Sequence, residues 1–321
     1  MVLKTVATDE YVREVLPETH ALWGAQRDFT RYAEDFRKVA DSAYGRRRPF
    51  TVGLRDDGRL VASCKLYDRD VRWGDRKLHA TGIGAVFTPP AYRGRGYASA
   101  MLGATLDRER SAGRDLAFLF SDIHPLFYAK LGFVRLPSRQ WTARAAALDG
   151  SRSGATQLEA SDWPLVRRCF EALDSAQTWS LKRTPLVWSW MRAMWSGAPP
   201  PSVQRVHLKV RKGRTVIAYV IGRRVTREDT FVIDDFAFAG DDGRTRLPAL
   251  LRAAAGDLRR VAAWLPPAHA REALLRGAVR ARKDSIFMIA PLSPDGRDWW
   301  RANRDGALHA RSDPVWSADH V

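Results

Sequence analysis

A glycine-containing turn, Arg93-Gly94-Arg95-Gly96-Tyr97-Ala98, constrains the fold of this chain more than any other feature. It follows a strand-like run over residues 81–87 and precedes a helix-like run over residues 99–110. A helix that begins in this way leaves the N–H groups of its first turn without helical acceptors, at the positive end of the helix dipole. The two glycines would let a bulky anion approach the backbone closely. The turn therefore predicts an α/β fold with a site for phosphate or pyrophosphate.

The composition indicates a globular protein of two domains. At 321 residues the chain is long for one core, and a hydrophobic fraction of 45% with 12 tryptophans excludes global disorder. Cys64 and Cys169 have no spacing typical of metal ligands, which predicts free thiols in a reducing cytoplasm and no metal site. No apolar run approaches the ~18 residues of a membrane span, and the N-terminus lacks the apolar region of a secretory signal. We therefore expect a cytoplasmic protein that does not enter a membrane.

The net charge of +17 permits nucleic-acid binding but does not favour it. The basic residues are scattered, and the densest cluster, Arg46-Arg47-Arg48, is short. A basic surface would also attract an anionic cofactor. We therefore rank nucleic acid well below a phosphate-bearing cofactor as the partner.

The order of expected elements recurs in the two halves of the chain. The first half reads as helices (10–24, 30–44), strands (50–54, 60–68, 78–87), the glycine turn and its helix, a strand (115–120), a short helix (125–131) and further strand character through Trp141. The second half reads as helices (163–173, 185–195), strands (206–210, 215–223, 230–239), a helix (247–261), a strand (262–265), a helix (269–279) and a final strand (285–292). Small residues over 145–155 suggest a linker between them. We therefore expect two α/β domains with mixed sheets, over residues 1–144 and 157–321, with a linker over residues 145–156.

The second half differs at the position of the glycine turn. It carries Gly240-Asp241-Asp242-Gly243-Arg244, with two acids where the first half has arginines. Because carboxylates repel phosphate, we expect the second copy to hold no cofactor.

Two motifs resemble those of the GNAT N-acetyltransferases. Arg93, Gly96 and Ala98 match the acetyl-CoA-binding signature Gln/Arg-x-x-Gly-x-Gly/Ala of that family. Tyr128, followed four residues later by Gly132-Phe133, is similar to the second signature of the family. The two motifs occur in the family's order and on the expected elements.

A narrower resemblance covers roughly residues 58–138, which are similar to the fungal lysine N-acetyltransferases. The tandem arrangement resembles the mycobacterial enhanced-intracellular-survival acetyltransferases, which have an active first domain and a degenerate second one. The resemblance implies transfer of acetyl from acetyl-CoA to a primary amine of a small molecule, with free lysine as the first choice and an aminoglycoside or a protein lysine as alternatives. The glutamate that many relatives carry before the turn is missing from residues 81–85. A non-catalytic acyl-CoA sensor or a nucleic-acid-associated module is therefore the alternative class.

The resemblance also assigns the residues that hold the cofactor. It implies that the backbone of Ala85, Val86 and Phe87 binds pantetheine and the acetyl carbonyl. It implies that the pyrophosphate lies on the amides of Arg93, Gly94, Arg95, Gly96, Tyr97, Ala98 and Ser99. Ser121 stands where many relatives have an asparagine that contacts the cofactor.

The catalytic assignments divide into an acid and a base. The resemblance implies that Tyr128 protonates the departing thiolate; the alternative is that its ring only packs beside its aromatic neighbours. For the base, Asp122 and His124 lie near the expected site, but Asp122 would also suit a helix cap and His124 a solvent-exposed position. The terminal carboxylate of Val321 is the third candidate, by similarity to the mycobacterial tandem enzymes, and a frayed terminus is its alternative.

Two further groups of residues stand out in the second half. One carboxylate of Asp234-Asp235 must point inward from a strand, where it would pair with an arginine across the domain interface or help to bind a cationic amine. The tryptophans that begin this half are expected to be mostly core, with one or two lining a substrate pocket: Trp179, Trp188, Trp190 and Trp195.

Overall fold

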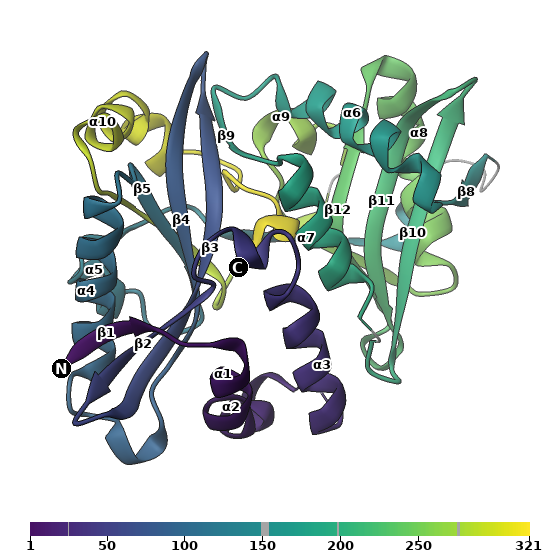
Figure 1. Cartoon of the computed structure of the whole chain (residues 1–321). Coiled ribbons are helices and arrows are strands. Elements are labelled where there is room, and N and C mark those ends of the chain that lie inside the picture. The colour runs from purple at the N-terminus through teal and green to yellow at the C-terminus, as the bar shows by residue number, and fades with distance from the viewer. Residues whose placement is uncertain (25, 149–153, 198, 275–276) are drawn as a thin grey trace.

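The computed structural model describes residues 1–24, 26–148, 154–197, 199–274 and 277–321. Two mixed β-sheets lie beside each other, with helices packed on their faces and the C-terminus between them (Figure 1). The first sheet has the strand order β1 (Val2–Thr5), β2 (Thr51–Asp56), β3 (Arg59–Trp73), β4 (Arg76–Phe87), β5 (Leu116–Ser121), β15 (Ile286–Pro291) and β6 (Val134–Arg135), and β9 (Trp179–Lys182) pairs with β3. The second has the order β14 (Ala278–Ala281), β7 (Arg139–Arg144), β13 (Arg260–Trp264), β12 (Thr230–Phe238), β11 (Thr215–Val225), β10 (Val203–Lys212) and β8 (Ala155–Gln157).

Each sheet contains one β–α–β unit of the same kind. In the first, helix α4 (Tyr97–Ser111) connects the parallel strands β4 and β5. In the second, helix α8 (Gly240–Ala255) connects the parallel strands β12 and β13. Parallel neighbours require such a crossover, whereas the antiparallel pairs around them can be joined by short turns. The prediction of two mixed α/β units with one architecture is confirmed.

Local sequence explains where the helices lie. Helix α3 (Phe29–Ala40) begins where the Asp28 side chain accepts the N–H of Arg31, and its buried residues form one apolar stripe. Along β3, the side chain of Cys64 packs in the cluster that includes α4, whereas that of Tyr67 packs in the cluster that includes α3. The first sheet is therefore covered on both faces.

The remaining helices pack around the same two sheets. Their bounds are α1 (Thr8–Glu14), α2 (Leu16–Trp23), α5 (Leu126–Ala129), α6 (Trp163–Asp174), α7 (Pro185–Trp195), α9 (Ala268–Arg271) and α10 (Pro294–Leu308). In Figure 1, α6 lies in front of the second sheet and α8 behind it, and both contact β11 and β12. None of the described helices has both the length and the apolar character needed to cross a bilayer.

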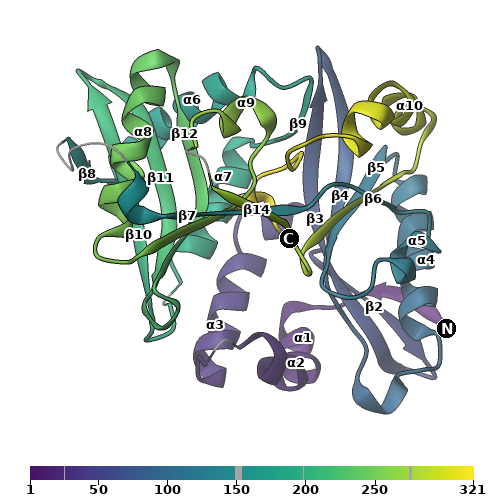
Figure 2. The same cartoon turned by 180° about the vertical axis from the view of Figure 1, so that it is seen from behind.

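Two strands differ from the predicted organisation because they are exchanged between the sheets. Strand β7 follows β6 directly but pairs with β13 in the second sheet, and β15, from near the end of the chain, pairs with β5 in the first (Figure 2). Each lies antiparallel beside the last strand of a β–α–β unit, so the two occupy equivalent places. The expected boundary at residue 144 therefore does not separate the sheets. That expectation assumed that strands pair with neighbours in the sequence, which is the commoner arrangement.

Smaller differences lie in the second half and at the linker. The segment expected to be one helix over 269–279 forms α9 and then β14, with residues 275–276 outside the described residues. Strand β9 and helix α10 were not predicted. Of the expected linker, residues 149–153 lie outside the described residues, and β8 begins at Ala155.

Candidate active site

Strand β4 leaves its regular pairing just before the glycine turn. Ser63 of β3 is paired with Phe87 and Lys65 with Gly84, so β4 carries one extra residue between the two pairs. Ala85, within this bulge, has φ of +47°, a left-handed conformation that an alanine adopts only at a cost of roughly 1–2 kcal/mol. Such a bulge turns backbone groups away from the ladder and makes them available to another partner.

The same end of β4 separates from β5. Their parallel pairing runs from Ala80 with Leu116 to Ile83 with Leu119, and the described register contains no pair beyond it. Strand β5 continues to Ser121 in its pairing with β15. The backbone after Ile83 is therefore not covered by β5, and the bulge lies on that uncovered stretch.

The glycine turn has the open backbone that an anion requires. Gly94 and Gly96 have φ of +77° and +80°, and a Cβ built on either would meet no atom within 4 Å. The N–H of Ala100 donates to the carbonyl of Gly96 at 3.0 Å, so the preceding N–H groups have no helical acceptor. The side chains of Arg93 and Arg95 are exposed. This arrangement fits a diphosphate at the start of α4.

The remaining predicted cofactor residues surround this opening. Tyr97 is half-buried, and its hydroxyl donates to Asp56 at 2.7 Å, which joins the start of α4 to the hairpin of β2 and β3. Ala98 is half-buried and Ser99 exposed at the helix start, whereas Val86 is half-buried and Phe87 buried at the end of β4. In the second sheet, Asp241 and Asp242 occupy the first turn of α8.

Tyr128 lies buried on α5 between two aromatic rings. Its ring centroid is 4.9 Å from that of Phe127 and 6.1 Å from that of Phe133. Burial, with a smaller contribution from Asp122, raises its pKa to about 12. Its hydroxyl has no hydrogen-bond partner among the described residues. The phenol is therefore protonated at neutral pH and free to donate.

Asp122, His124 and Ser121 instead connect β5 to its neighbours. Asp122 accepts hydrogen bonds from the backbone N–H and the hydroxyl of Ser285, at 2.9 and 3.2 Å. Nδ1 of the exposed His124 lies 3.4 Å from the N–H of Leu126 at the start of α5. The Ser121 hydroxyl donates to the carbonyl of Ile123 at 2.8 Å. Asp122 therefore holds the start of β15 and does not cap α5, whose N-cap position is Pro125.

The C-terminal carboxyl group lies against the strand that carries the bulge. A Cβ built on Gly84 would be 2.7 Å from the carboxyl carbon of Val321, so only a glycine fits there without a shift. Gly84 directly precedes Ala85. Of the three candidate bases, the structure therefore brings Val321 to the bulge.

A buried ion network holds this C-terminal tail. Asp319 accepts from Arg69 of β3 at 2.6 Å and from Arg183 at 3.2 and 3.3 Å. Arg183 also pairs with Asp235 of β12 at 2.9 and 3.0 Å, and Asp235 accepts from the hydroxyl of Tyr219 at 2.8 Å. These side chains are almost fully buried. The predicted pairing of an inward carboxylate with an arginine is confirmed for Asp235, although Arg183 comes from the same half of the chain and not from across the expected domain interface. The network reaches the first half through the bond between Asp319 and Arg69.

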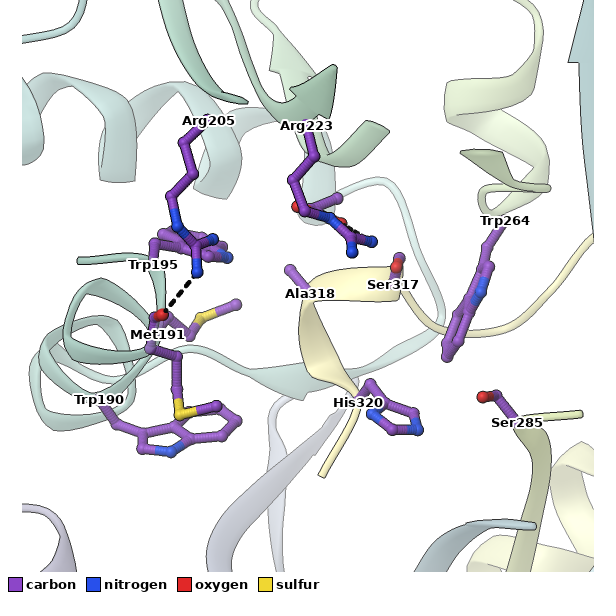
Figure 3. A pocket seen from close by; sticks show the side chains of 12 residues that line it. Trp190, Met191, Trp195, Arg205, Arg223, Trp264, Ser285, Ser317, Ala318 and His320 are labelled. Atoms are coloured by element: carbon purple, nitrogen blue, oxygen red, sulfur yellow. Dashed lines mark hydrogen bonds and ion pairs between the residues drawn. The ribbon is translucent and has the colours of Figure 1, made fainter. Parts of the chain in front are cut away.

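A cavity of about 420 Å³ opens between the tail and the second sheet (Figure 3). Trp190, Trp195 and Trp264 form its aromatic walls, so two of the four tryptophans expected to be core or pocket residues line it. Trp179 and Trp188 are buried in the cores.

His320 reaches the cavity from the tail. Its ring packs at 5.0 Å from Phe120 and 5.7 Å from Trp264, while part of it stays open to the cavity. The residue as a whole is exposed, and the packing around its ring lowers the pKa of His320.

The cavity adjoins the bulge through two side-chain contacts. The ring of Trp190 lies 5.5 Å from that of Tyr67, and Tyr67 in turn lies 3.2 Å from a Cβ built on Gly84. One wall of the cavity is therefore linked through Tyr67 to the strand position beside which the Val321 carboxyl group lies.

Several cavity residues were missed from the sequence, namely Arg205, Arg223, Trp264, Ser285 and His320. They come from separate elements, so no local motif contains them. The Asp234-Asp235 pair was the only signal near them, because Asp234 pairs with Arg223 at 2.9 Å. Among the described residues, no cluster of His, Cys, Asp and Glu side chains could hold a metal ion.

Comparisons with known proteins agree with this architecture. Residues 6–135 match the model of the acetyltransferase (GNAT) domain. A lysine acetyltransferase of Yarrowia lipolytica is 33% identical over 113 residues, which cover 32% of this chain and 28% of that protein. The matched region therefore spans less than a third of the length of the curated relative.

Two solved structures share the fold along most of the chain. A GCN5-related N-acetyltransferase from Anabaena variabilis has a TM-score of 0.71 at 15% identity, covering 91% of this chain and 73% of that one. Eis1 from Mycobacterium abscessus has a TM-score of 0.59 at 14% identity, with coverage of 91% and 73%. At these identities the likeness establishes the fold. Together with the family match, it shows that the chain carries, over residues 6–135, a domain of the GNAT acetyltransferase family.

Proposed function

We propose that the chain is an N-acetyltransferase that transfers acetyl from acetyl-CoA directly to a primary amine of a small molecule, with free lysine or a similar amine as the acceptor. The observation that carries this proposal is the position of the Val321 carboxyl group against Gly84, next to the bulge at Ala85 and the wedge between β4 and β5. The name of the Yarrowia relative supports an amine acceptor of the lysine type.

The cofactor would be held mainly by backbone groups. The N–H groups of residues 94–99 suit the diphosphate, whereas that of Arg93 donates to the carbonyl of Pro90 at 3.3 Å. The uncovered backbone of Ala85, Val86 and Phe87 suits the pantetheine arm. Acetyl-CoA supplies an acetyl thioester, whose carbonyl carbon accepts a nucleophile and whose sulfur leaves. A basic protein surface favours the approach and binding of this polyanionic molecule.

Two residues of the chain would move the protons of the reaction. The Val321 carboxylate accepts the proton that the amine loses as its nitrogen bonds to the acetyl carbon. The Tyr128 hydroxyl donates its proton to the sulfur as the carbon–sulfur bond breaks, because its raised pKa keeps it protonated until that moment. Asp122 and His124 have other partners, so we give them no step.

The acceptor would enter through the cavity between the sheets. Its aromatic walls suit the apolar stem of an aliphatic amine, and Trp190 in one wall contacts Tyr67, which lies beside Gly84. Cys64 and Cys169 are buried free thiols, as expected for the reducing cytoplasm that we propose as the location.

Thiol release from acetyl-CoA in the presence of a panel of amines tests the proposal. We expect release with small primary amines, and its loss when one glycine is added after Val321, because that addition converts the carboxylate into an amide. A glycine added before Met1 is the matched control and should leave the rate unchanged. Tight CoA binding without release for any amine would instead indicate a non-catalytic acyl-CoA sensor.

A further inference from the structure

One guanidinium group in the cavity has no carboxylate partner. Arg205 on β10 is half-buried, and it donates only to two backbone carbonyls, those of Gly197 at 3.1 Å and Met194 at 3.3 Å. Within the part of the chain that the structure describes, no carboxylate lies within ion-pair distance of it. Arg223 differs, because Asp234 binds it at 2.9 Å. The cavity therefore carries two guanidinium groups and one carboxylate among its lining residues.

This excess positive charge is held in an environment that opposes it. Burial lowers the pKa of Arg205. The carboxylates of Asp234 and Asp35 oppose this effect, while Arg223 and Arg27 add to it. A partly desolvated charge without a partner costs free energy, which an incoming anion would offset. The planar fork of a guanidinium group matches the two oxygens of a carboxylate better than it matches most other groups.

The arrangement of the cavity places this charge opposite the tail. In Figure 3, Arg205 and Arg223 point into the cavity from the strands of the second sheet, and His320 lies on the opposite side. The opposite side is also the one that leads through Trp190 and Tyr67 to the Val321 carboxyl group. The guanidinium groups therefore lie on the side of the cavity away from His320 and the C-terminal tail.

We propose that Arg205, assisted by Arg223, binds a carboxylate of the acceptor, so that the substrate is an amino acid type of amine with separated positive and negative ends. This inference rests on the proposed function only for the claim that the bound molecule also carries an amine that is acetylated. It disfavours polyamines and aminoglycosides, which would place another cation near Arg205 at a cost. Arg205 is thus a specificity-determining residue that lies far from the reacting atoms.

Matched pairs of amines that differ only in a carboxylate test this inference. The pairs are lysine with 1,5-diaminopentane, ornithine with 1,4-diaminobutane, and 5-aminopentanoate with 1-aminobutane. Binding is followed by tryptophan fluorescence in the CoA-loaded protein, since three tryptophans line the cavity. Turnover is followed by thiol release. For at least one pair we expect the carboxylate-bearing member to be preferred by about ten- to a hundredfold, the range of a charge-assisted hydrogen bond.

Substitution of Arg205 should remove that preference selectively. Arg205→Gln should weaken binding and turnover of the carboxylate-bearing amine of each pair by the same factor, and should leave those of the amine without a carboxylate unchanged. Arg205→Lys should retain part of the preference. Arg214→Gln is the matched control, because Arg214 is exposed at the far end of the same hairpin. Thermal melting confirms that each variant is folded.

The outcomes separate this inference from the proposed function. Turnover without preference in any pair, or a preference that survives in Arg205→Gln, overturns the carboxylate site and leaves the acetyltransferase proposal intact. Selective binding that is lost in Arg205→Gln, without thiol release for any amine, supports the carboxylate site and overturns the acetyltransferase proposal. Absence of binding for all six amines overturns the inference.

Discussion

Replacement of Asp319 by asparagine tests whether the buried ion network fixes the C-terminal tail. Asparagine keeps the shape of the side chain but leaves Arg69 and Arg183 with one carboxylate, that of Asp235, in a nearly dry environment. Removing one member of a buried ion pair typically costs about 3–5 kcal/mol. Because a folded protein has about 5–15 kcal/mol of stability in total, we expect a folded but clearly weakened variant.

The pH dependence of this loss follows from the charge of Asp319. Burial by itself raises the pKa of Asp319, but Arg183 and Arg69 outweigh it and hold the pKa below its ordinary value. The stabilising contribution is therefore fully present above the unfolded pKa, about 3.9, and it is lost only as the pH falls through the lower folded pKa. The difference between wild type and Asp319→Asn should stay constant from pH 7 to pH 8, above the pKa of Asp235, which burial raises to about 6, and should change at pH 5.5, where Asp235 also titrates.

Urea unfolding at pH 5.5, 7 and 8 measures the difference, and thiol release measures activity. Asp298→Asn is the matched control, because it removes an exposed ion pair with Arg301 in the same part of the chain and should cost less than about 1 kcal/mol. A loss below about 1 kcal/mol for Asp319→Asn would refute the energetic reasoning. A large loss with unchanged kcat would refute the role of the tail in catalysis.

Three further substitutions test individual contacts. Gly84→Ala places a methyl group 2.7 Å from the carboxyl carbon of Val321. We therefore expect kcat to fall by roughly 10²-fold or more, with a smaller effect on the KM of acetyl-CoA. If the variant kept wild-type kinetics, Val321 would be excluded as the base. Tyr128→Phe should lower kcat by a similar factor without weakening CoA binding in a titration, and an unchanged kcat would exclude Tyr128 as the acid. Burial lowers the pKa of Lys65 to about 8, so its charged form is disfavoured in the folded protein and Lys65→Met should raise the thermal stability at pH 7.5. That gain should shrink by pH 10, because the wild type gains stability as the pH rises from the folded towards the unfolded pKa; a gain independent of pH would contradict the assignment.

The parts of the site that were predictable are contiguous in the sequence. The turn at residues 93–98 could be predicted because glycines at positive φ, a preceding strand and a following helix are all local properties. Tyr128 could be identified by its motif in the same way. The two β–α–β units also follow from local periodicity, which determines the type of each element.

The parts that were not predictable depend on contacts between distant residues. Arg69 and Asp319 are 250 positions apart, and neither lies in a pattern that indicates the other. Arg205 and Arg223 become neighbours of the tail only through the folding of β10 and β11. Periodicity likewise assigns β7 and β15 as strands but cannot say which sheet each one joins.

The exchanged strands and the C-terminal tail belong to one structural arrangement. After β15 has paired in the first sheet, the chain passes through α10 and returns to the point where the sheets meet. There Asp313 accepts the N–H of Arg139 at the start of β7, at 2.6 Å, and pairs with Arg282, at 3.1 Å, just before β15. The tail is thus fixed first at the crossing of the exchanged strands and then by the network around Asp319. Because the first of these anchors lies at the exchanged strands, the position of Val321 beside Gly84 depends in part on a topology in which neither half of the chain completes its own sheet.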